Sequence, residues 1–492
     1  MRSRVPRRAP HALAAPLALA ASLAFAAPLA AQSAGVAARP DATRRPTRAQ
    51  VVRTVDSAAK ALIDAGQAPS ISVAVIRGRD TLVMKAYGRA DLENDVPATP
   101  THVYRIGSIT KQFTSAGVMR LVEQGKVALD DDFTRYVKFD THGRTVTVRQ
   151  LLNHTSGIRS YTSVGERWRR RWREDMVPDT IVAHVTNDSL DFEPGTGWSY
   201  NNSGYVLLGM LIEKVSGKPY AKYVEDEFFR PLGLTSTYYC ETRPLIKRRA
   251  RGYERGPDGF VNAEYLSMSQ PYAAGSLCST TVDLVRWNDA LARGRVVRPE
   301  SYALMAGPST QKDGTPIKSG YGFGLATRTF GERRAITHSG GINGFSSDMA
   351  WLPDDSVLVV ALVNASSPAA GRVIRLAAAA ALGDPLPTPP TPGQVPAAVS
   401  LTAAELARYV GEYRLAMPGG ERTLDVRIAD EGERLVAYPA GQSPKPLTAL
   451  GGNTFADSTD PDVRVRFVLE NGRATKMLFT QAGQTMEAAR IR

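Results

Sequence analysis

The sequence predicts an α/β (α+β) protein in which an antiparallel sheet is flanked by helices and carries an inserted helical lobe. A small C-terminal all-β, barrel-like domain follows. A helix and two strand-like runs open the ordered region, while a series of strand-like runs and one helix close it near residue 382. Short alternating runs then follow a proline-rich stretch. Because strands lie at both ends of residues 47–382, the simplest arrangement is one sheet built from both ends.

The opening elements are a helix and a hairpin. Thr47 suits the N-cap of a helix whose apolar residues recur at helical spacing. Residues 71–76 and 81–87 are strand-like runs joined by the turn-like Arg77-Gly-Arg-Asp80. The predicted order is therefore helix, strand, turn and strand.

The closing elements mirror this order. Strands are predicted at 320–325, 335–338, 345–352 and 356–363, followed by a helix from about 369 to 381. Inside the lobe, residues 108–124 and 204–215 are predicted as helices, and Gly217 is the stop signal of the second.

The last part of the chain differs in composition. Residues 383–400 are predicted to be a proline-rich linker, extended and semi-rigid. Residues 401–492 hold short alternating runs, and Asn471-Gly472 between two of them is a strong hairpin signal. The sequence therefore predicts a separate barrel-like or sandwich domain there. The runs lie at 409–415, 423–428, 435–438, 463–469 and 474–480.

The N-terminus has the pattern of an export signal. Four arginines precede an Ala/Leu-rich run at residues 12–27, and a small-residue cleavage site ends at Ala31. We expect residues 1–31 to be a cleaved signal peptide. The alternative is a retained membrane anchor, for which the apolar run is rather short and too rich in alanine. Residues 32–46 are an expected disordered leader. With no second long apolar run, the mature protein is expected to be exported, periplasmic or secreted, without a membrane span.

Charge and cysteine content limit the partners. The net charge of +13 falls to +9 without residues 1–31, which hold four arginines and no acids. The densest basic stretch is residues 167–173. We interpret it as a solvated helix face whose tryptophans pack inward, in preference to a binding site for an anionic ligand. No nucleic-acid-reading module is recognisable, so nucleic acid is not an expected partner. Cys240 and Cys278 are compatible with one disulfide or with two buried thiols.

Three short motifs carry the chemistry. Ser108-Ile-Thr-Lys111 places a hydroxyl and an amine on one helix face, where a lysine with a suppressed charge can activate the serine. Tyr200 and Asn202 point to one side of an extended approach to the next helix. His338-Ser-Gly-Gly341 ends a strand, where Gly340 and Gly341 let a substrate approach the backbone. No metal or cofactor fingerprint appears, so neither is expected.

Together, these motifs resemble those of the serine β-lactamase and penicillin-binding-protein superfamily, over roughly residues 47–382. Tyr200-x-Asn202 resembles the class C β-lactamase, esterase and D-aminopeptidase branch. The resemblance implies Ser108 as nucleophile, Lys111 with Tyr200 as the proton-transfer pair, and the Ser108 and Gly341 N–H groups as oxyanion hole. Asn202, His338, Gly340 and Gly341 are the implied substrate-binding residues.

The main departure from the β-lactamases is His338, which stands where they carry lysine. This difference favours small peptides, D-amino-acid derivatives or esters as substrates over β-lactams. The alternatives are a β-lactamase or D-Ala-D-Ala carboxypeptidase proper, or a non-catalytic protein that binds peptidoglycan. His154, which could be mistaken for a catalytic histidine, is interpreted as structural. The C-terminal domain resembles the barrel-like appendages of D-aminopeptidases.

Overall fold

The computed structural model describes residues 45–256, 259–386, 398–416, 423–432, 434–439, 445–457, 463–481 and 484–491. The predicted signal peptide, nearly all of the leader and most of the linker lie outside these residues. None of the helices among the described residues combines the length and the apolar character that crossing a membrane requires.

A seven-stranded antiparallel sheet forms the centre of the larger domain, in the order β3-β2-β1-β12-β11-β10-β9. Strands β1 and β12 pair side by side, with Ile71 opposite Val363, so the sheet is built from both ends of the region as predicted. Its strands are β1 (Ser70–Arg77), β2 (Asp80–Asp91), β3 (Val96–Pro97), β9 (Ala326–Phe330), β10 (Arg333–Ile342), β11 (Phe345–Leu352) and β12 (Val357–Val363).

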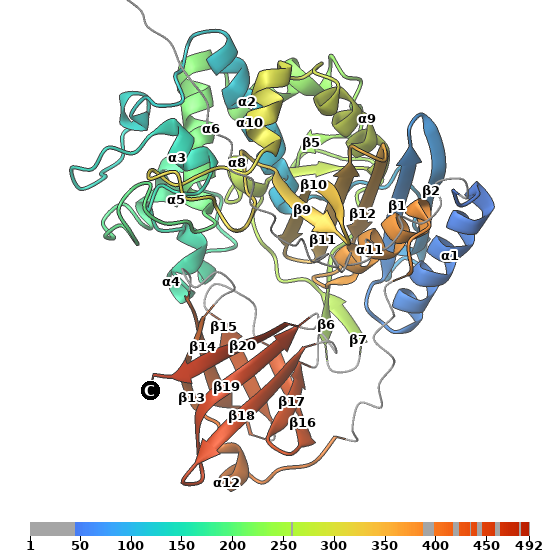
Figure 1. Ribbon diagram of the computed structural model, residues 1–492, viewed down its shortest axis with the longest axis vertical. Coiled ribbons are helices and arrows are strands. Elements are labelled where there is room, and N and C mark those ends of the chain that lie inside the picture. The colour runs from blue at the N-terminus through green and yellow to red at the C-terminus, as the bar shows by residue number, and fades with distance from the viewer. Residues whose placement is uncertain are drawn as a thin grey trace, which may run out of the picture. The chain divides into compact units, whose positions relative to one another are not determined.

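Two helices, α1 (Arg48–Asp64) and α11 (Ala369–Leu382), cover one face of this sheet (Figure 1). Thr47 caps α1 as predicted: its side chain accepts from the backbone N–H of Gln50, whose own side chain accepts from the Thr47 backbone. The α1 residues that face the sheet recur at spacings of three and four. Strand β12 is buried along its whole length because alternate residues pack into this helix-covered core and into the core on the other face of the sheet.

The strand predicted at residues 320–325 is wrong, since the strand in this region, β9, begins only at Ala326. Gly320 and Gly324 both have positive φ, of 67° and 70°. A Cβ on Gly324 would lie 2.6 Å from the Lys111 carbonyl oxygen, so this glycine lets the loop lie directly against the helix that carries Lys111. The apolar residues between the two glycines therefore belong to a loop that packs against this helix and do not form a strand.

The lobe on the other sheet face is mainly helical, as predicted. Its central helix, α2 (Thr110–Glu123), is buried on nearly every side and is preceded by a 3-10 turn, η1 (Gly107–Ile109). Helix α6 (Asn202–Ser216) ends at Gly217, which has φ of 70°. The other α-helices are α3 (Val148–Leu152), α4 (Glu166–Arg169), α5 (Pro178–Ala183), α7 (Tyr220–Val224), α8 (Tyr272–Gly275), α9 (Thr281–Ala292) and α10 (Pro299–Ala306).

Short strands complete the lobe. They are β4 (Tyr104–Arg105), β5 (Tyr238–Tyr239), β6 (Tyr253–Gly256), β7 (Gly259–Asn262) and β8 (Leu277–Ser279). Two further 3-10 turns are η2 (Phe133–Arg135) and η3 (Tyr161–Ser163). Strand β8 lies between β4 and β5, and β4 leads directly into the turn that holds Ser108.

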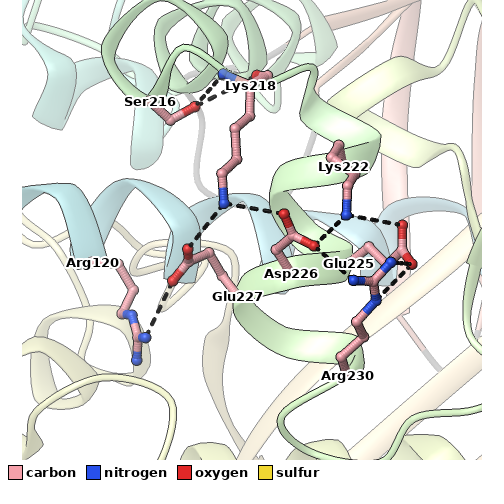
Figure 2. A network of polar contacts seen from close by, with 8 residues as sticks. All are labelled: Arg120, Ser216, Lys218, Lys222, Glu225, Asp226, Glu227 and Arg230. Atoms are coloured by element: carbon pink, nitrogen blue, oxygen red, sulfur yellow. Dashed lines mark hydrogen bonds and ion pairs between the residues drawn. The ribbon is translucent and has the colours of Figure 1, made fainter.

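A network of ion pairs holds the C-terminal half of α2 (Figure 2). Arg120 of α2 pairs with Glu227 at 3.3 Å, and Glu227 lies in a π-helical turn, η4 (Glu225–Phe229). Lys218 bridges Asp226 at 3.1 Å and Glu227 at 3.8 Å, while Lys222 and Arg230 pair with Asp226. Linked pairs constrain one another more than isolated surface pairs do, so the network fixes α2 against residues 218–230.

The C-terminal domain is a closed eight-stranded antiparallel barrel, as predicted. Asn471 and Gly472 have φ of 51° and 77° and join the paired residues Glu470 and Arg473, which confirms the two-residue hairpin. The strands are β13 (Gly411–Ala416), β14 (Thr423–Asp430), β15 (Leu435–Pro439), β16 (Lys445–Gly451), β17 (Thr454–Asp457), β18 (Arg464–Glu470), β19 (Arg473–Gln481) and β20 (Gln484–Arg490), preceded by the one-turn helix α12 (Ala403–Leu406).

Two further predictions have structural answers. Cys240 and Cys278 are free thiols, both buried in a small apolar cluster with Val103 and Met268. In the basic stretch, only the first residues are helical, in α4. Trp168 packs against the core and its indole N–H donates to Gln270 Oε1 at 2.8 Å. Arg167, by contrast, faces outward and pairs with Asp188 at 2.7 Å.

Candidate active site

Lys111 lies where the predicted motifs meet. Its Nζ lies 3.2 Å from Ser108 Oγ and 2.8 Å from Asn202 Oδ1. The third partner is the carbonyl oxygen of Ala274, at 2.8 Å. The first two partners come from separate sequence motifs, so the fold brings Ser108, Lys111 and Asn202 into direct contact.

The surroundings of Lys111 favour a neutral amine. The side chain is 0% exposed, and burial lowers its pKa well below the usual value for a lysine. None of its three hydrogen-bond partners is a carboxylate. A neutral amine has two N–H donors and one lone pair. The amide and carbonyl oxygens can take the two donors, and the lone pair is then left for the Ser108 hydroxyl.

Ser108, unlike Lys111, is not fully buried. It is partly exposed, whereas residues 109–119 are all buried. The preceding residue, Gly107, has φ of 49°, and a Cβ there would lie 3.1 Å from the backbone nitrogen of Gly341. Glycine at 107 therefore allows the backbones of η1 and β10 to touch, which brings the N–H groups predicted to form the oxyanion hole into the same neighbourhood.

Tyr200 lies over Lys111, whose Nζ is 4.7 Å from the centre of the phenol ring. The phenol oxygen is buried and makes no hydrogen bond of good geometry with any described group. Burial raises the pKa of Tyr200, and the neighbouring Ser108 hydroxyl opposes part of that rise. The phenol therefore carries its proton at neutral pH.

His154 supports this arrangement from behind. Its Nδ1 accepts from the backbone N–H of Asn201 at 3.1 Å, and its ring centre lies 4.5 Å from that of Tyr200. His154 itself has φ of 66°, an uncommon conformation for a non-glycine residue. These contacts agree with the interpretation of His154 as a structural residue that positions the Tyr200 segment.

The amide of Asn202 is held in one orientation. Asn202 is the first residue of α6, and the preceding Asn201 caps that helix through Gly204 N–H at 2.8 Å. The Asn202 Nδ2 donates to Thr162 Oγ1 at 3.1 Å, and its backbone N–H donates to Ser160 Oγ at 3.1 Å. Because the amide nitrogen faces Thr162, the amide oxygen faces Lys111.

His338 is uncharged in this structure. Its Nδ1 lies 2.6 Å from the Ser339 carbonyl oxygen, to which it can only donate, and its Nε2 lies 2.9 Å from the Tyr321 hydroxyl. Burial lowers the pKa of His338 to about 3. His338, which the sequence resemblance places where β-lactamases carry lysine, therefore supplies no positive charge.

Gly340 and Gly341 lie on a strand segment with one open edge. Strand β10 pairs with β9 only up to Thr337, whereas its pairing with β11 continues to Ile342. A Cβ on Gly340 would lie 2.0 Å from the Ile106 carbonyl oxygen, but a Cβ on Gly341 would meet nothing within 4 Å. Gly340 therefore lets the sheet approach the Ser108 turn, and Gly341 borders open space.

Sequence reasoning missed two groups of the site. The Ala274 carbonyl belongs to the backbone of α8, and a backbone acceptor has no residue-type signal. Tyr321 lies in the loop at residues 320–325, for which the sequence predicts a strand, and the sequence does not indicate its contact with His338. Within the described parts of the chain, no three His, Cys, Asp or Glu side chains gather in a way that could hold a metal ion.

The fold and this site define a serine hydrolase of the β-lactamase and penicillin-binding-protein fold. The beta-lactamase family model matches residues 55–384, and the chain belongs to that family. Penicillin-binding protein 4* of Bacillus subtilis (strain 168) is 28% identical over 443 residues, which are 86% of this chain and 95% of that protein. This similarity extends beyond the family match and into the C-terminal part.

Two solved structures are similar to about two thirds of the chain. The D-amino acid amidase from Ochrobactrum anthropi SV3 is 27% identical, with a TM-score of 0.60, over 67% of this chain and 98% of its own. The D-stereospecific amidohydrolase from Streptomyces sp. is 30% identical, with a TM-score of 0.58, over 69% of this chain and all of its own.

Proposed function

We propose that the protein hydrolyses small amides and esters that have no terminal carboxylate, including D-amino-acid amides, through an acyl-enzyme on Ser108. The observation that carries this proposal is the environment of Lys111: a fully buried amine whose three partners are a hydroxyl, an amide oxygen and a backbone carbonyl. A lysine kept neutral by burial is a base strong enough to activate a serine at neutral pH.

In the first step, Ser108 Oγ attacks the substrate carbonyl carbon while its proton passes to Lys111 Nζ. The developing oxyanion is stabilised by the backbone N–H groups of Ser108 and Gly341. A preorganised donor of this kind contributes about 3 kcal/mol to transition-state stabilisation. Asn202 keeps the Lys111 amine aimed at Ser108 throughout.

In the second half of acylation, the leaving group must receive a proton. Tyr200 holds a phenol proton beside Ser108 because burial raises its pKa. It donates that proton to the departing nitrogen or oxygen and is reprotonated by Lys111, which leaves the amine neutral again. Water then attacks the acyl-enzyme with the same groups in the reverse roles, releasing the acid and restoring the Ser108 hydroxyl.

Substrate choice follows from His338. A neutral imidazole hydrogen-bonded to Tyr321 offers no cation to a substrate carboxylate, so amides and esters are preferred to β-lactams and to peptides with a free C-terminus. The D-amino acid amidase and D-stereospecific amidohydrolase among the similar structures support D-configured amides as the first substrates to examine. The N-terminal pattern supports action outside the cytoplasm.

The test is covalent labelling followed by turnover. Wild type, Ser108→Ala and the control Ser189→Ala, which changes an exposed serine, are treated with a fluorophosphonate and with fluorescent penicillin. We expect the fluorophosphonate to label wild type and Ser189→Ala but not Ser108→Ala. D-Phenylalanine amide, p-nitrophenyl acetate and nitrocefin then rank amide, ester and lactam turnover. If neither probe labels Ser108 and peptidoglycan still binds, the protein is a non-catalytic binder.

A further inference from the structure

A cavity of about 1210 Å³ lies on the helical-lobe side of the sheet, and its lining does not include Ser108, Lys111 or His338. Strands β1, β10, β11 and β12 form its floor, and helices α9 and α10 form its wall. This volume is at or above the usual range of ligand pockets, about 300–1,000 Å³. We call it the arginine groove, after the residues at its rim.

The floor of the arginine groove is a continuous apolar row. Ile336 pairs with Trp351, Trp351 with Leu358, and Leu358 with Ile76, and all four side chains line the cavity. Neighbouring strands lie about 4.8 Å apart, so the row is roughly 14 Å long. Trp351 and Ile76 are only partly buried, so part of this apolar surface is open to a ligand.

The rim carries five arginines, at positions 79, 286, 293, 295 and 334, but the lining holds a single carboxylate, Asp289. Arg293 and Arg295 share Asp289. Arg286 and Arg334 pair with Asp283 and Asp354, which lie outside the lining, at 3.1 and 3.4 Å. Arg79 has no ion pair with any residue that the structure describes. The rim therefore keeps an excess of positive charge.

Two of these arginines lie at the two ends of the apolar row. Arg79 lies in the turn between β1 and β2, three residues after Ile76, and Arg334 precedes Ile336 by two residues on the same face of β10. Both arginines line the cavity. The side chain of Arg334 is 54% exposed, and its pair with Asp354 is correspondingly weak. An anionic ligand can therefore take the place of the aspartate at little cost.

We infer that the arginine groove binds a small amphipathic anion, with an apolar aromatic or aliphatic body on the Ile336–Ile76 row. Its carboxylate, phosphate or sulfonate lies at Arg79 or Arg334, since guanidinium groups bind such anions through paired hydrogen bonds. The inference does not depend on the Ser108 chemistry. His338, which lies two residues beyond Ile336 on β10, belongs to the other site.

The test uses 8-anilinonaphthalene-1-sulfonate, an aromatic anion, and N-phenyl-1-naphthylamine, its uncharged counterpart. We expect saturable sulfonate binding to the full-length protein, with at least about tenfold weaker binding in the double variant Arg79→Gln/Arg334→Gln. The matched control, Arg53→Gln/Arg466→Gln, removes the same charge from exposed positions outside the groove and is expected to bind as wild type does. Bound probe is also expected to quench Trp351 emission, a signal that Trp351→Phe removes.

Four results would overturn the inference. Equal affinity in the groove double variant and in its control would show that the arginines do not bind the anion. Equal affinity for the uncharged probe would show that charge plays no part. Unchanged quenching in Trp351→Phe would show that the probe binds elsewhere. Displacement of the probe by an equal concentration of inorganic phosphate would show that the apolar floor does not contribute to binding.

Discussion

The amine of Lys111 lies 3.2 Å from the hydroxyl of Ser108, and Lys111 is wholly buried whereas Ser108 is partly exposed. The remaining partners of the amine are uncharged oxygens of Asn202 and Ala274. An ammonium would be costly in this position, since no carboxylate offsets its desolvation. This arrangement supports the proposed proton transfer from serine to lysine.

The first prediction concerns the ability of residue 111 to lose its proton. Lys111→Arg keeps a long cationic side chain but cannot be deprotonated at any working pH. We expect kcat/KM for a p-nitrophenyl ester to fall by about 10³-fold, within the range of general-base contributions. Lys126→Arg, at an exposed position just after α2, is the control. Retention of a tenth of wild-type activity in Lys111→Arg would exclude Lys111 as the base, provided circular dichroism shows an unchanged fold.

The second prediction is the shape of the pH–rate profile. Activity requires neutral Lys111, so kcat/KM is expected to fall as the pH drops through the pKa of this residue, which burial holds well below that of a free lysine. His338, with a pKa near 3, should add no limb between pH 5 and 8. The profiles of wild type and His338→Gln are therefore expected to share one acid limb. A limb near pH 6.5 that disappears in His338→Gln would contradict the neutral histidine.

The third prediction links the same lysine to stability. In the folded state its pKa is lowered, so between that value and about 10.4 the unfolded chain binds a proton that the folded chain does not. The contribution of Lys111 to the free energy of unfolding therefore rises with pH, by at most about 1.4 kcal/mol per pH unit. Lys111→Met removes this dependence. Urea unfolding at pH 6, 8 and 10 is expected to show wild type gaining on the variant as pH rises, and a constant difference would refute it.

The sequence was sufficient for those parts of the site that are encoded in short stretches. Ser108 and Lys111 lie one helical turn apart whatever surrounds them, and the Asn471-Gly472 turn needs only its own two residues. The contacts of Tyr321 and Ala274 depend on how distant segments pack. Residues 320–325 form a loop because Gly320 and Gly324 have positive φ and the loop packs against the helix that carries Lys111. Nothing in the apolar run itself indicates that this helix lies beside it.

The fourth prediction addresses substrate preference. His338→Lys places a cation where the wild type has a neutral ring, so acylation by a substrate with a carboxylate should gain relative to an uncharged ester. We expect the ratio of kcat/KM for benzylpenicillin acylation to that for p-nitrophenyl acetate to rise by about tenfold, a typical value for one charge-assisted hydrogen bond. Tyr321→Phe, which removes only the donor to Nε2, is the control and should change the ratio less. An unchanged ratio in His338→Lys would mean that the carboxylate binds elsewhere.

The last prediction separates two adjacent glycines. In Gly340→Ala the new methyl group would lie 2.0 Å from the Ile106 carbonyl oxygen, which is backbone and cannot swing away. Strand β10 and the turn that holds Ser108 must therefore separate, at a cost of about 1–3 kcal/mol in unfolding free energy, as for other overpacked sites. The same separation moves Gly341 away from Ser108, so kcat is expected to fall as well.

Gly341→Ala is the matched comparison, since its methyl group would meet nothing within 4 Å. Its unfolding free energy should stay within about 0.5 kcal/mol of wild type, the usual range for substitutions without a steric conflict. Because Gly341 borders the open edge of β10, any effect should appear in KM for bulky substrates rather than in stability. Urea unfolding and steady-state kinetics of the two variants together provide the check. Equal stability of the two variants would mean that the contact between β10 and Ile106 does not hold the Ser108 turn in place.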